Sequence, residues 1–306
     1  MKTSNKMNRR FSRKAFTLIE IMVATVIMVI LVGLVVQITS EVLKVWNRSS
    51  GKLSANAEAR IAMDLLTQDL ETAVFRNNGQ QWLRVEAPRD PGGDYTNQTV
   101  ALKLFTPALD RPKVDSGGNP IPGDICAVGY RLAFKQSYNS GPNVYALYRK
   151  VVDARSTFNN YLGSASDSSS PQTSLGASSS ADWSEIGAGS ITDNENYLVS
   201  NIVEFKVILY EDDGTLTAVT PLNADASGNV TQTYAYGGIA DGAGVLGTDP
   251  LRYADVVLTV ISDEGLKLLE RFNDVGSFEG YSDADAIVAE YGDVFTRRVN
   301  FLARPL

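Results

Sequence analysis

The chain has 306 residues, of which 44% are apolar and 21% charged, values typical of a folded globular protein and inconsistent with wholesale disorder. It contains no histidine, which excludes a catalytic site built on a histidine base, and its single cysteine excludes an intramolecular disulfide and a cysteine-rich zinc site. Its formal net charge of −7 argues against a general nucleic-acid binder.

The charge is unevenly distributed along the chain. Residues 1–15 carry six basic side chains and no acidic one, which leaves 22 basic and 35 acidic side chains, a net charge of −13, in residues 16–306. The basic side chains are Lys2, Lys6, Arg9, Arg10, Arg13 and Lys14. A break in charge this sharp indicates a targeting segment that ends at residue 15.

Residues 16–38 form an apolar segment of 23 residues that contains one acidic side chain, Glu20. As a helix it is about 35 Å long, enough to cross the roughly 30 Å hydrocarbon core of a bilayer with some tilt. The basic flank predicts a cytoplasmic N-terminus and an extracytoplasmic C-terminal part. A carboxylate inside a membrane costs about 3 kcal/mol on insertion scales, so Glu20 requires an explanation.

Three interpretations of this N-terminus compete. A cleaved secretory signal has a shorter apolar run and a small-residue cleavage site, which Ile38-Thr39-Ser40 matches poorly. An uncleaved signal anchor accounts for the length but not for Glu20. Cleavage between Ala15 and Phe16 creates a new α-amino group four residues before Glu20, and the two charges can then neutralise each other within a subunit or between neighbours. We favour this third interpretation.

The sequence Lys14-Ala15-Phe16-Thr17-Leu18-Ile19-Glu20 resembles the class III leader of type IV prepilins and pseudopilins. The resemblance implies that a prepilin peptidase cuts after Ala15 and methylates the amine of Phe16. It also implies that Glu20 guides the register of subunits as they join a filament. Two departures stand out: Ala15 replaces the usual glycine, and Gln37 stands where many members have a helix-kinking proline.

Residues 39–78 predict an amphipathic stalk helix that continues the membrane helix. Between Glu41 and Arg76 there is no proline, and apolar side chains recur at helical spacing. These side chains are Val42, Trp46, Leu53, Ala57, Ile61, Leu65, Leu66, Leu70 and Val74. We expect this stripe to pack on the head, with Gly51 as a soft point. The segment from Arg60 to Arg76 is similar to that of the J-type minor pseudopilins of type II secretion.

Residues 79–306 predict a β-rich extracytoplasmic head, in which short apolar runs are separated by turn-forming residues. We expect strands near 100–105, 128–134, 144–152, 202–210, 255–262 and 294–302, with a hairpin turn at 211–214. Helices are expected at 263–272 and after a cap at Ser282, with Asp285 three residues on. The fold class is therefore α+β, with one long N-terminal helix packed on an antiparallel sheet.

Two segments of the head predict flexible loops. Residues 164–180 hold nine serines in seventeen positions, and residues 223–250 are rich in glycine and aspartate.

Three segments of the head are similar to J-type pseudopilins. They are Leu147-Tyr148-Arg149, the strand from Asn201 to Tyr210, and the closing run from Val294 to Val299. The same segments are more similar still to the pilin-like Verru_Chthon cassette protein C group.

Two glycine- and aspartate-rich motifs suggest ligand binding but fit it poorly. The run Gly242–Gly247 matches G-x-G-x-x-G without the strand before it and the helix after it that a dinucleotide site needs. The run Asn223–Asn229 begins like an EF-hand loop, but its twelfth position is Tyr234, where a bidentate glutamate is required. We expect no cofactor, and calcium in this irregular loop is the weaker alternative.

The remaining candidates favour structural roles. The acid pairs Asp212/Asp213 and Asp283/Asp285 fall at turn and helix-start positions, where acids are expected without any catalysis. Arg297-Arg298 is too small a basic group for a DNA-binding groove. Cys126 is expected to be a small buried side chain. These features do not predict an enzyme.

The sequence therefore predicts a pilin-like filament subunit, of the minor pseudopilin kind, assembled from the inner membrane by a type IV pilus or type II secretion-like machine. Its expected partners are other pilin-like subunits, a prepilin peptidase and inner-membrane assembly proteins, and no nucleic acid. The alternative is a membrane-anchored extracytoplasmic module that binds a ligand or a surface.

Overall fold

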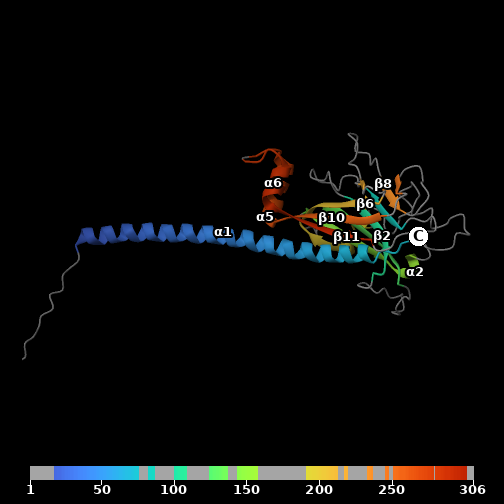
Figure 1. Cartoon of the computed structure of the whole chain (residues 1–306). Helices are drawn as coiled ribbons and strands as arrows, with labels where there is room; N and C mark the ends of the chain where they lie inside the picture. Colours follow the sequence, from blue (N-terminus) through green and yellow to red (C-terminus); the bar gives the residue numbers. More distant parts are fainter. Residues whose placement is uncertain are drawn as a thin grey trace, which may run out of the picture. The chain divides into compact units, whose positions relative to one another are not determined.

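The computed structural model describes residues 17–75, 82–86, 100–108, 124–136, 143–157, 191–212, 217–219, 233–236, 245–247, 251–278 and 280–301 (Figure 1). Contacts divide the chain into two compact units, Met1–Ser50 and Gly51–Leu306. The described part of the first unit is helical, and the second unit holds two β-sheets. The finer boundaries that the sequence suggests, at residues 15, 38 and 78, remain predictions.

Helix α1 (Leu18–Glu71) is the longest element, with 54 residues. No proline interrupts it, and Gly33 and Gly51 both lie within the helix, so neither breaks it. In the first unit every described helical side chain is exposed. In the second unit α1 buries one face, which consists of Ala55, Ala59, Ala62, Met63, Leu66, Thr67, Asp69 and Leu70.

A seven-stranded sheet forms one wall of the second unit, in the order β5-β4-β3-β2-β1-β8-β9. Its strands are β1 (Leu83–Glu86), β2 (Ala101–Thr106), β3 (Cys126–Gln136), β4 (Asn143–Val152), β5 (Tyr197–Ser200), β8 (Thr233–Tyr236) and β9 (Val245–Gly247). All neighbours pair antiparallel except β8 and β9, which pair parallel. The pair of long strands β3–β4 sets Tyr130 directly opposite Arg149.

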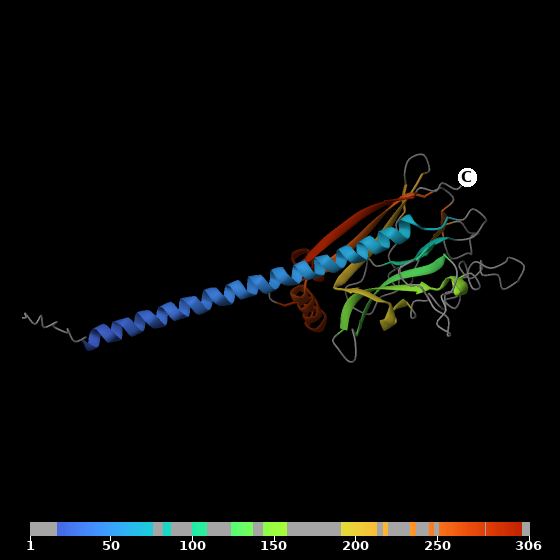
Figure 2. The same ribbon diagram turned by 90° about the horizontal axis from the view of Figure 1, so that it is seen from below.

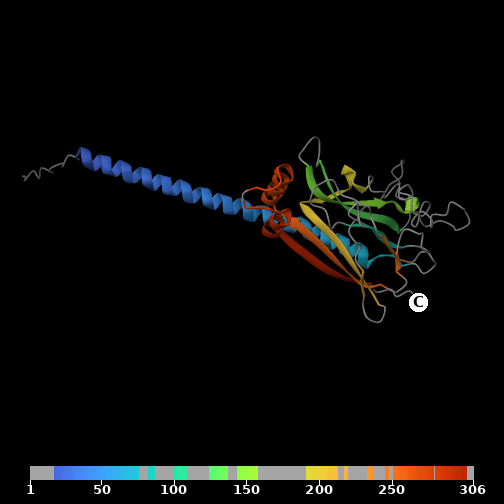
Figure 3. The same cartoon turned by 90° about the horizontal axis from the view of Figure 1, so that it is seen from above.

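A four-stranded antiparallel sheet forms the other wall, in the order β11-β10-β6-β7 (Figure 3). Its strands are β6 (Ile202–Glu211), β7 (Thr217–Val219), β10 (Leu251–Ile261) and β11 (Gly292–Asn300). In β10, Ala254, Val256 and Leu258 are buried while Asp255 and Val257 between them are partly exposed. This period of two is that of a strand with one face toward a core.

One apolar core joins the buried face of α1 to both sheets. The end of α1 runs alongside β11 (Figure 2), where Arg297 donates to Asp64 and the Phe75 and Phe301 rings meet edge to face at 5.8 Å. These two contacts show that β11 runs in the same direction as α1. The helix therefore lies along the sheets, with its C-terminal end at the end of β11.

Two helices between β10 and β11 cover a second apolar cluster. Helix α5 (Asp263–Val275) is capped by Ser262, whose hydroxyl accepts from the Gly265 amide at 3.3 Å, and helix α6 (Ala284–Tyr291) returns the chain to β11. A side chain on Gly265 would have its Cβ 2.5 Å from Cβ of Tyr291, so the glycine permits the close packing. Short helical turns α2 (Ala154–Thr157) and η2 (Asn194–Asn196) complete the described elements.

The α+β class predicted from the sequence is confirmed. All six expected strands are present, as β2, β3, β4, β6, β10 and β11, and the expected hairpin joins β6 to β7. Helix α5 begins where predicted. The cap predicted for the next helix was wrong: Asp283, not Ser282, accepts from the Asp285 amide, at 3.0 Å.

Two further predictions need correction. The apolar stripe assigned to the stalk is buried only toward its end: Leu66 and Leu70 are fully buried, but Leu53 and Ile61 are 69% and 63% exposed. Earlier in the helix Ala55, Ala59 and Ala62 are buried instead. The segment 223–250 is not a continuous loop, because β8 and β9 lie within it; β8 pairs with β1, and β9 pairs with β8. Residues 164–180 lie outside the described part of the chain.

Candidate functional site: the N-terminal helix

The predicted processing site lies at the edge of the described structure. Ala15 and Phe16 fall outside the described residues, and the first described residue is Thr17. The structure therefore leaves cleavage between Ala15 and Phe16 as a prediction. What it does show is the local conformation of the next residues, including Glu20.

Glu20 lies in the first turn of α1, where it caps the helix. Its Oε2 atom accepts from the Thr17 amide at 3.0 Å and from the Thr17 hydroxyl at 3.1 Å. The Glu20 amide in turn donates to Oγ1 of Thr17 at 3.4 Å. This reciprocal pattern is a capping box, and it satisfies amides that have no partner within the helix. The carboxylate also interacts favourably with the positive end of the helix dipole.

The rest of the N-terminal unit has the properties of a membrane helix. An 18-residue window of α1 has a mean hydropathy of 2.9, and none of that window is buried. Exposing so much apolar surface to water is unfavourable, at about 25 cal/mol per Å². By length and composition the segment can cross a membrane. Within α1 it is followed by Glu41, Lys44 and Arg48, the first charged side chains after Glu20.

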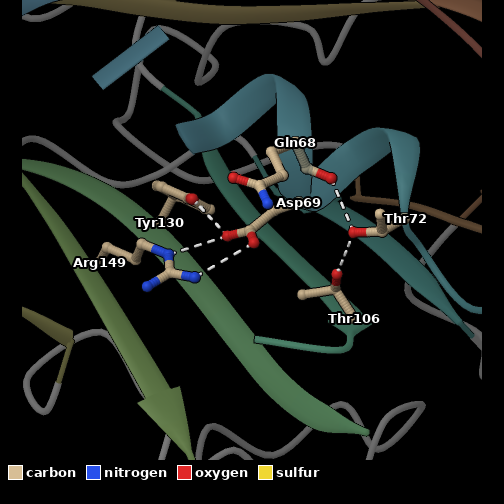
Figure 4. Close-up of polar contacts among 6 residues, drawn as sticks. All are labelled: Gln68, Asp69, Thr72, Thr106, Tyr130 and Arg149. Carbon is tan, nitrogen blue, oxygen red and sulfur yellow. Dashed lines mark hydrogen bonds and ion pairs between the residues drawn. The ribbon is translucent and has the colours of Figure 1, made fainter. Parts of the chain in front are cut away.

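A buried polar cluster connects the other end of α1 to the seven-stranded sheet (Figure 4). Arg149 donates from Nε to Oδ2 of Asp69 at 2.8 Å and from Nη2 to Oδ1 at 3.1 Å. The Tyr130 hydroxyl donates to the same Oδ2 at 2.5 Å. Asp69 is 3% exposed, Arg149 1% and Tyr130 0%. We call these three residues the Asp69 cluster.

The environment of the Asp69 cluster fixes its charge state. Burial raises the pKa of the Tyr130 hydroxyl well above its usual value, and the adjacent Asp69 charge raises it further. Tyr130 therefore stays a neutral donor, while the guanidinium and carboxylate compensate one another in two parallel hydrogen bonds. A buried ion pair is stable only when its hydrogen bonds are satisfied in this way.

Further polar contacts bind α1 to other strands. Just after the end of α1, Thr72 and Thr106 of β2 share a hydrogen bond of 2.7 Å (Figure 4). The Val74 amide donates to the Phe105 carbonyl at 2.8 Å. About four turns earlier in α1, Ser200 of β5 donates to Glu58 at 3.2 Å. The C-terminal part of α1 and the residues just after it are thus attached to the seven-stranded sheet.

Sequence reasoning did not identify Asp69 and Arg149 as partners. The available signal was an aspartate between the buried Leu66 and Leu70 of the helix, together with an arginine inside an apolar strand. Because 80 residues separate them, their contact depends on the tertiary fold.

Other residues singled out in the sequence have structural roles. Arg297 pairs with Asp64, and Arg298 pairs with Asp255 through two hydrogen bonds of 2.7 Å while stacking 4.0 Å from the centre of the Tyr253 ring. Their use in ion pairs accounts for the basic doublet without nucleic acid. Cys126 is buried, as expected.

The loop motifs yield no site in the described residues. Of the Gly242–Gly247 run only 245–247 are described, and they form β9; the Asn223–Asn229 run and Asp213 lie outside the described part of the chain. Asp212 pairs with Arg252 at 3.6 Å, and Asp283 caps α6. Among the described residues, no group of three or more acidic or cysteine side chains is placed to hold a metal ion.

Comparisons with known proteins agree with the N-terminal signal. The family described as "Prokaryotic N-terminal methylation motif" matches residues 10–36. No curated protein matches the chain. A solved structure, the type IV-like pilin TTHA1219 from Thermus thermophilus, aligns with 11% identity and a TM-score of 0.35, covering 81% of this chain and 97% of that one. This level of similarity assigns no residue roles. The chain thus carries a prokaryotic N-terminal methylation motif that leads into an exposed apolar helix.

Proposed function

We propose that this protein is a pilin-like filament subunit, and more narrowly a minor pseudopilin, built into a filament by a type IV pilus or type II secretion-like machine. The observation that carries the proposal is the methylation motif at residues 10–36, which continues into an apolar helix with no buried residue in its most hydropathic window. A methylated N-terminus on such a helix suits a subunit that leaves the membrane and packs against other helices.

The proposed life history has two stages. In the first, the basic leader stays in the cytoplasm, α1 spans the inner membrane, and the second unit lies outside. A prepilin peptidase then cuts between Ala15 and Phe16 and methylates the Phe16 amine. In the second stage, inner-membrane assembly proteins transfer the subunit to other pilin-like subunits. The proposed subunit needs no cofactor and catalyses no reaction.

Glu20 has a defined role in this proposal. In the structure its carboxylate is held by Thr17 on its own helix. Cleavage adds a cationic amine at Phe16, one residue before Thr17, so the carboxylate gains a charge partner that can belong to its own or a neighbouring subunit. Such a partner lowers the cost of an acid within the membrane. It also ties the axial position of one subunit to the next.

The narrower assignment to J-type pseudopilins rests on resemblance in several segments. Support comes from the contact between two of them, because Asp69 of the Arg60–Arg76 segment pairs with Arg149 of Leu147-Tyr148-Arg149. A third segment, Val294–Val299, lies in β11 and supplies Arg297 to Asp64. These segments together bring α1 and both sheets into one unit.

A pair of matched variants tests the proposal. In cells that carry the assembly machine, Glu20→Gln should be cleaved and remain in the membrane but fail to enter sheared filaments. The control Glu41→Gln removes an exposed acid of the same helix beyond the apolar segment, and it should assemble normally. Normal assembly of Glu20→Gln would instead favour the alternative, a membrane-anchored binding module.

A further inference from the structure

The α1–head contact combines an apolar surface with a few directional polar contacts. The buried face of α1 begins with Ala55, Ala59 and Ala62, each at most 4% exposed. Apolar packing has no directional preference, so within this surface only the sizes of the side chains distinguish one axial position of the helix from another.

The sequence of α1 makes one alternative position nearly as apolar. If a pull on the N-terminus moved the helix by four residues, about 6 Å, residues 59, 63, 66 and 70 would take the places of 55, 59, 62 and 66. Those residues are Ala59, Met63, Leu66 and Leu70. The shifted face is therefore still apolar, although Met63 and Leu66 replace the smaller Ala59 and Ala62.

Polar side chains distinguish the two positions sharply. In the shifted chain the residue four places on, Ala73, would take the place of Asp69, and the fully buried Arg149 would face an alanine. Asp69 would be displaced from both its partners, leaving buried charge without compensation.

The geometry of the Asp69 cluster suits it to hold an axial position. Tyr130 and Arg149 lie directly opposite each other on the adjacent strands β3 and β4. Both reach Oδ2 of Asp69, and the second guanidinium bond fixes the orientation of the carboxylate plane. A single aspartate on α1 thus binds two adjacent strands, of which β4 lies next to the edge strand β5.

We propose that the Asp69 cluster is an axial lock, which fixes the register of α1 along the head and resists sliding of the helix when α1 is pulled along its axis. The lock itself follows from contacts within the second unit. Its use rests on the proposed function, because a filament subunit held through its N-terminal helix carries load between that helix and the head.

A double variant separates locking from stability. Asp69→Leu with Arg149→Met replaces the buried pair by apolar side chains of similar length, an exchange that often preserves or raises equilibrium stability. Parent and variants all carry Cys126→Ala and Tyr130→Phe, so that no buried tyrosine hydroxyl loses its acceptor. Each full-length protein, in detergent, is held between tags at its N- and C-termini under constant force. Because α1 and β11 run in the same direction, this pull loads the α1–head contact in shear.

The lock predicts that the double variant retains the thermal midpoint of the parent but releases α1 at least roughly tenfold faster at the same force. The control Asp255→Leu with Arg298→Met removes an equally well-formed pair that does not touch α1, and it should release at the parental rate. If the double variant and the parent have equal thermal midpoints and release α1 at equal rates, the proposal of an axial lock is wrong.

A disulfide keeps the test decisive if the double variant is unstable. Thr72→Cys with Thr106→Cys ties α1 to β2 at a position where the two hydroxyls are 2.7 Å apart. In the double-variant background, the oxidised form should recover the parental release rate, and reduction should abolish the recovery. Fast release of α1 in the oxidised form would contradict the proposal that the axial register of α1 on the head controls the release rate. Neither measurement depends on filament assembly, so failure of the lock leaves the proposed function untouched.

Discussion

The two parts of α1 use apolar residues in opposite ways. In residues 18–50 all the large aliphatic side chains are exposed. In residues 51–71 the buried face begins with three alanines, Ala55, Ala59 and Ala62, whereas the large Leu53 and Ile61 are exposed. Their acids differ as well: Glu20 is exposed at the helix start, and Asp69 is buried against Arg149. The size of the apolar side chains therefore does not decide which face of α1 is buried. That face is decided by the strands that pack against the helix.

The largest effect is expected when the buried pair of the second part is broken. Arg149→Met alone leaves Asp69 buried and charged without its partner, which should lower the free energy of unfolding by about 3–5 kcal/mol. Chemical denaturation in detergent measures it. The matched control is Arg298→Met. Because the Arg298 side chain is half exposed, its removal should lower the free energy of unfolding by less than about 1 kcal/mol. Equal losses in the two variants would show that the burial of Asp69 is unimportant.

Overfilling the alanine face should have the next largest effect. Ala59 is fully buried, so Ala59→Leu adds a branched side chain where there is no free space. It should lower the free energy of unfolding by about 1–3 kcal/mol because neighbouring side chains are displaced. Ala57→Leu makes the same change on the exposed face and should stay within roughly 0.5 kcal/mol. Comparing the thermal midpoints of the two variants checks which face of α1 contacts the head. The stripe predicted from the sequence requires the opposite order.

Alkaline pH should weaken the second part of α1 through Tyr130. Its pKa in the folded protein lies above the ordinary value of 10.0, so its contribution to stability is complete below about pH 10. Above that pH the unfolded chain loses the proton first, and the free energy of unfolding should fall by up to about 1.4 kcal/mol per pH unit. Tyr130→Phe should show a shallower decline than the parent. Identical slopes would mean that the Tyr130 pKa is unshifted.

The smallest effect concerns the cap of α6, which the sequence placed one residue too early. Asp283→Ala removes the side chain that accepts from the Asp285 amide and should cost about 1 kcal/mol. Ser282→Ala should change the thermal midpoint little. The reverse order would restore Ser282 as the cap.

The first part of α1 was predictable from local sequence because its signals are local. Six basic residues, a four-residue spacing from the cut to Glu20, and a continuous apolar run all occur within 38 residues of the N-terminus. Short apolar runs bounded by turn-forming residues likewise predicted strands such as β3 and β10. These patterns depend only on which neighbours a residue has along the chain.

The second part of α1 was not predictable in the same way. Helical spacing identified apolar positions but could not show that the head accepts the small Ala55 and Ala59 more closely than Leu53. Asp69 finds Arg149 and Tyr130 only once β3 and β4 are paired. Short strands such as β1 and β8 have no strong alternation of their own and are defined by backbone pairing with neighbours.

The N-terminus of the mature protein tests the central claim most directly. Protein isolated from membranes of cells that express a prepilin peptidase should begin at Phe16 and carry a methyl group on its α-amine, as read by N-terminal peptide mass spectrometry. A control without the peptidase should retain Met1. An intact N-terminus in the presence of the peptidase, or a new N-terminus near Ser40, would contradict assignment as a pilin-like subunit.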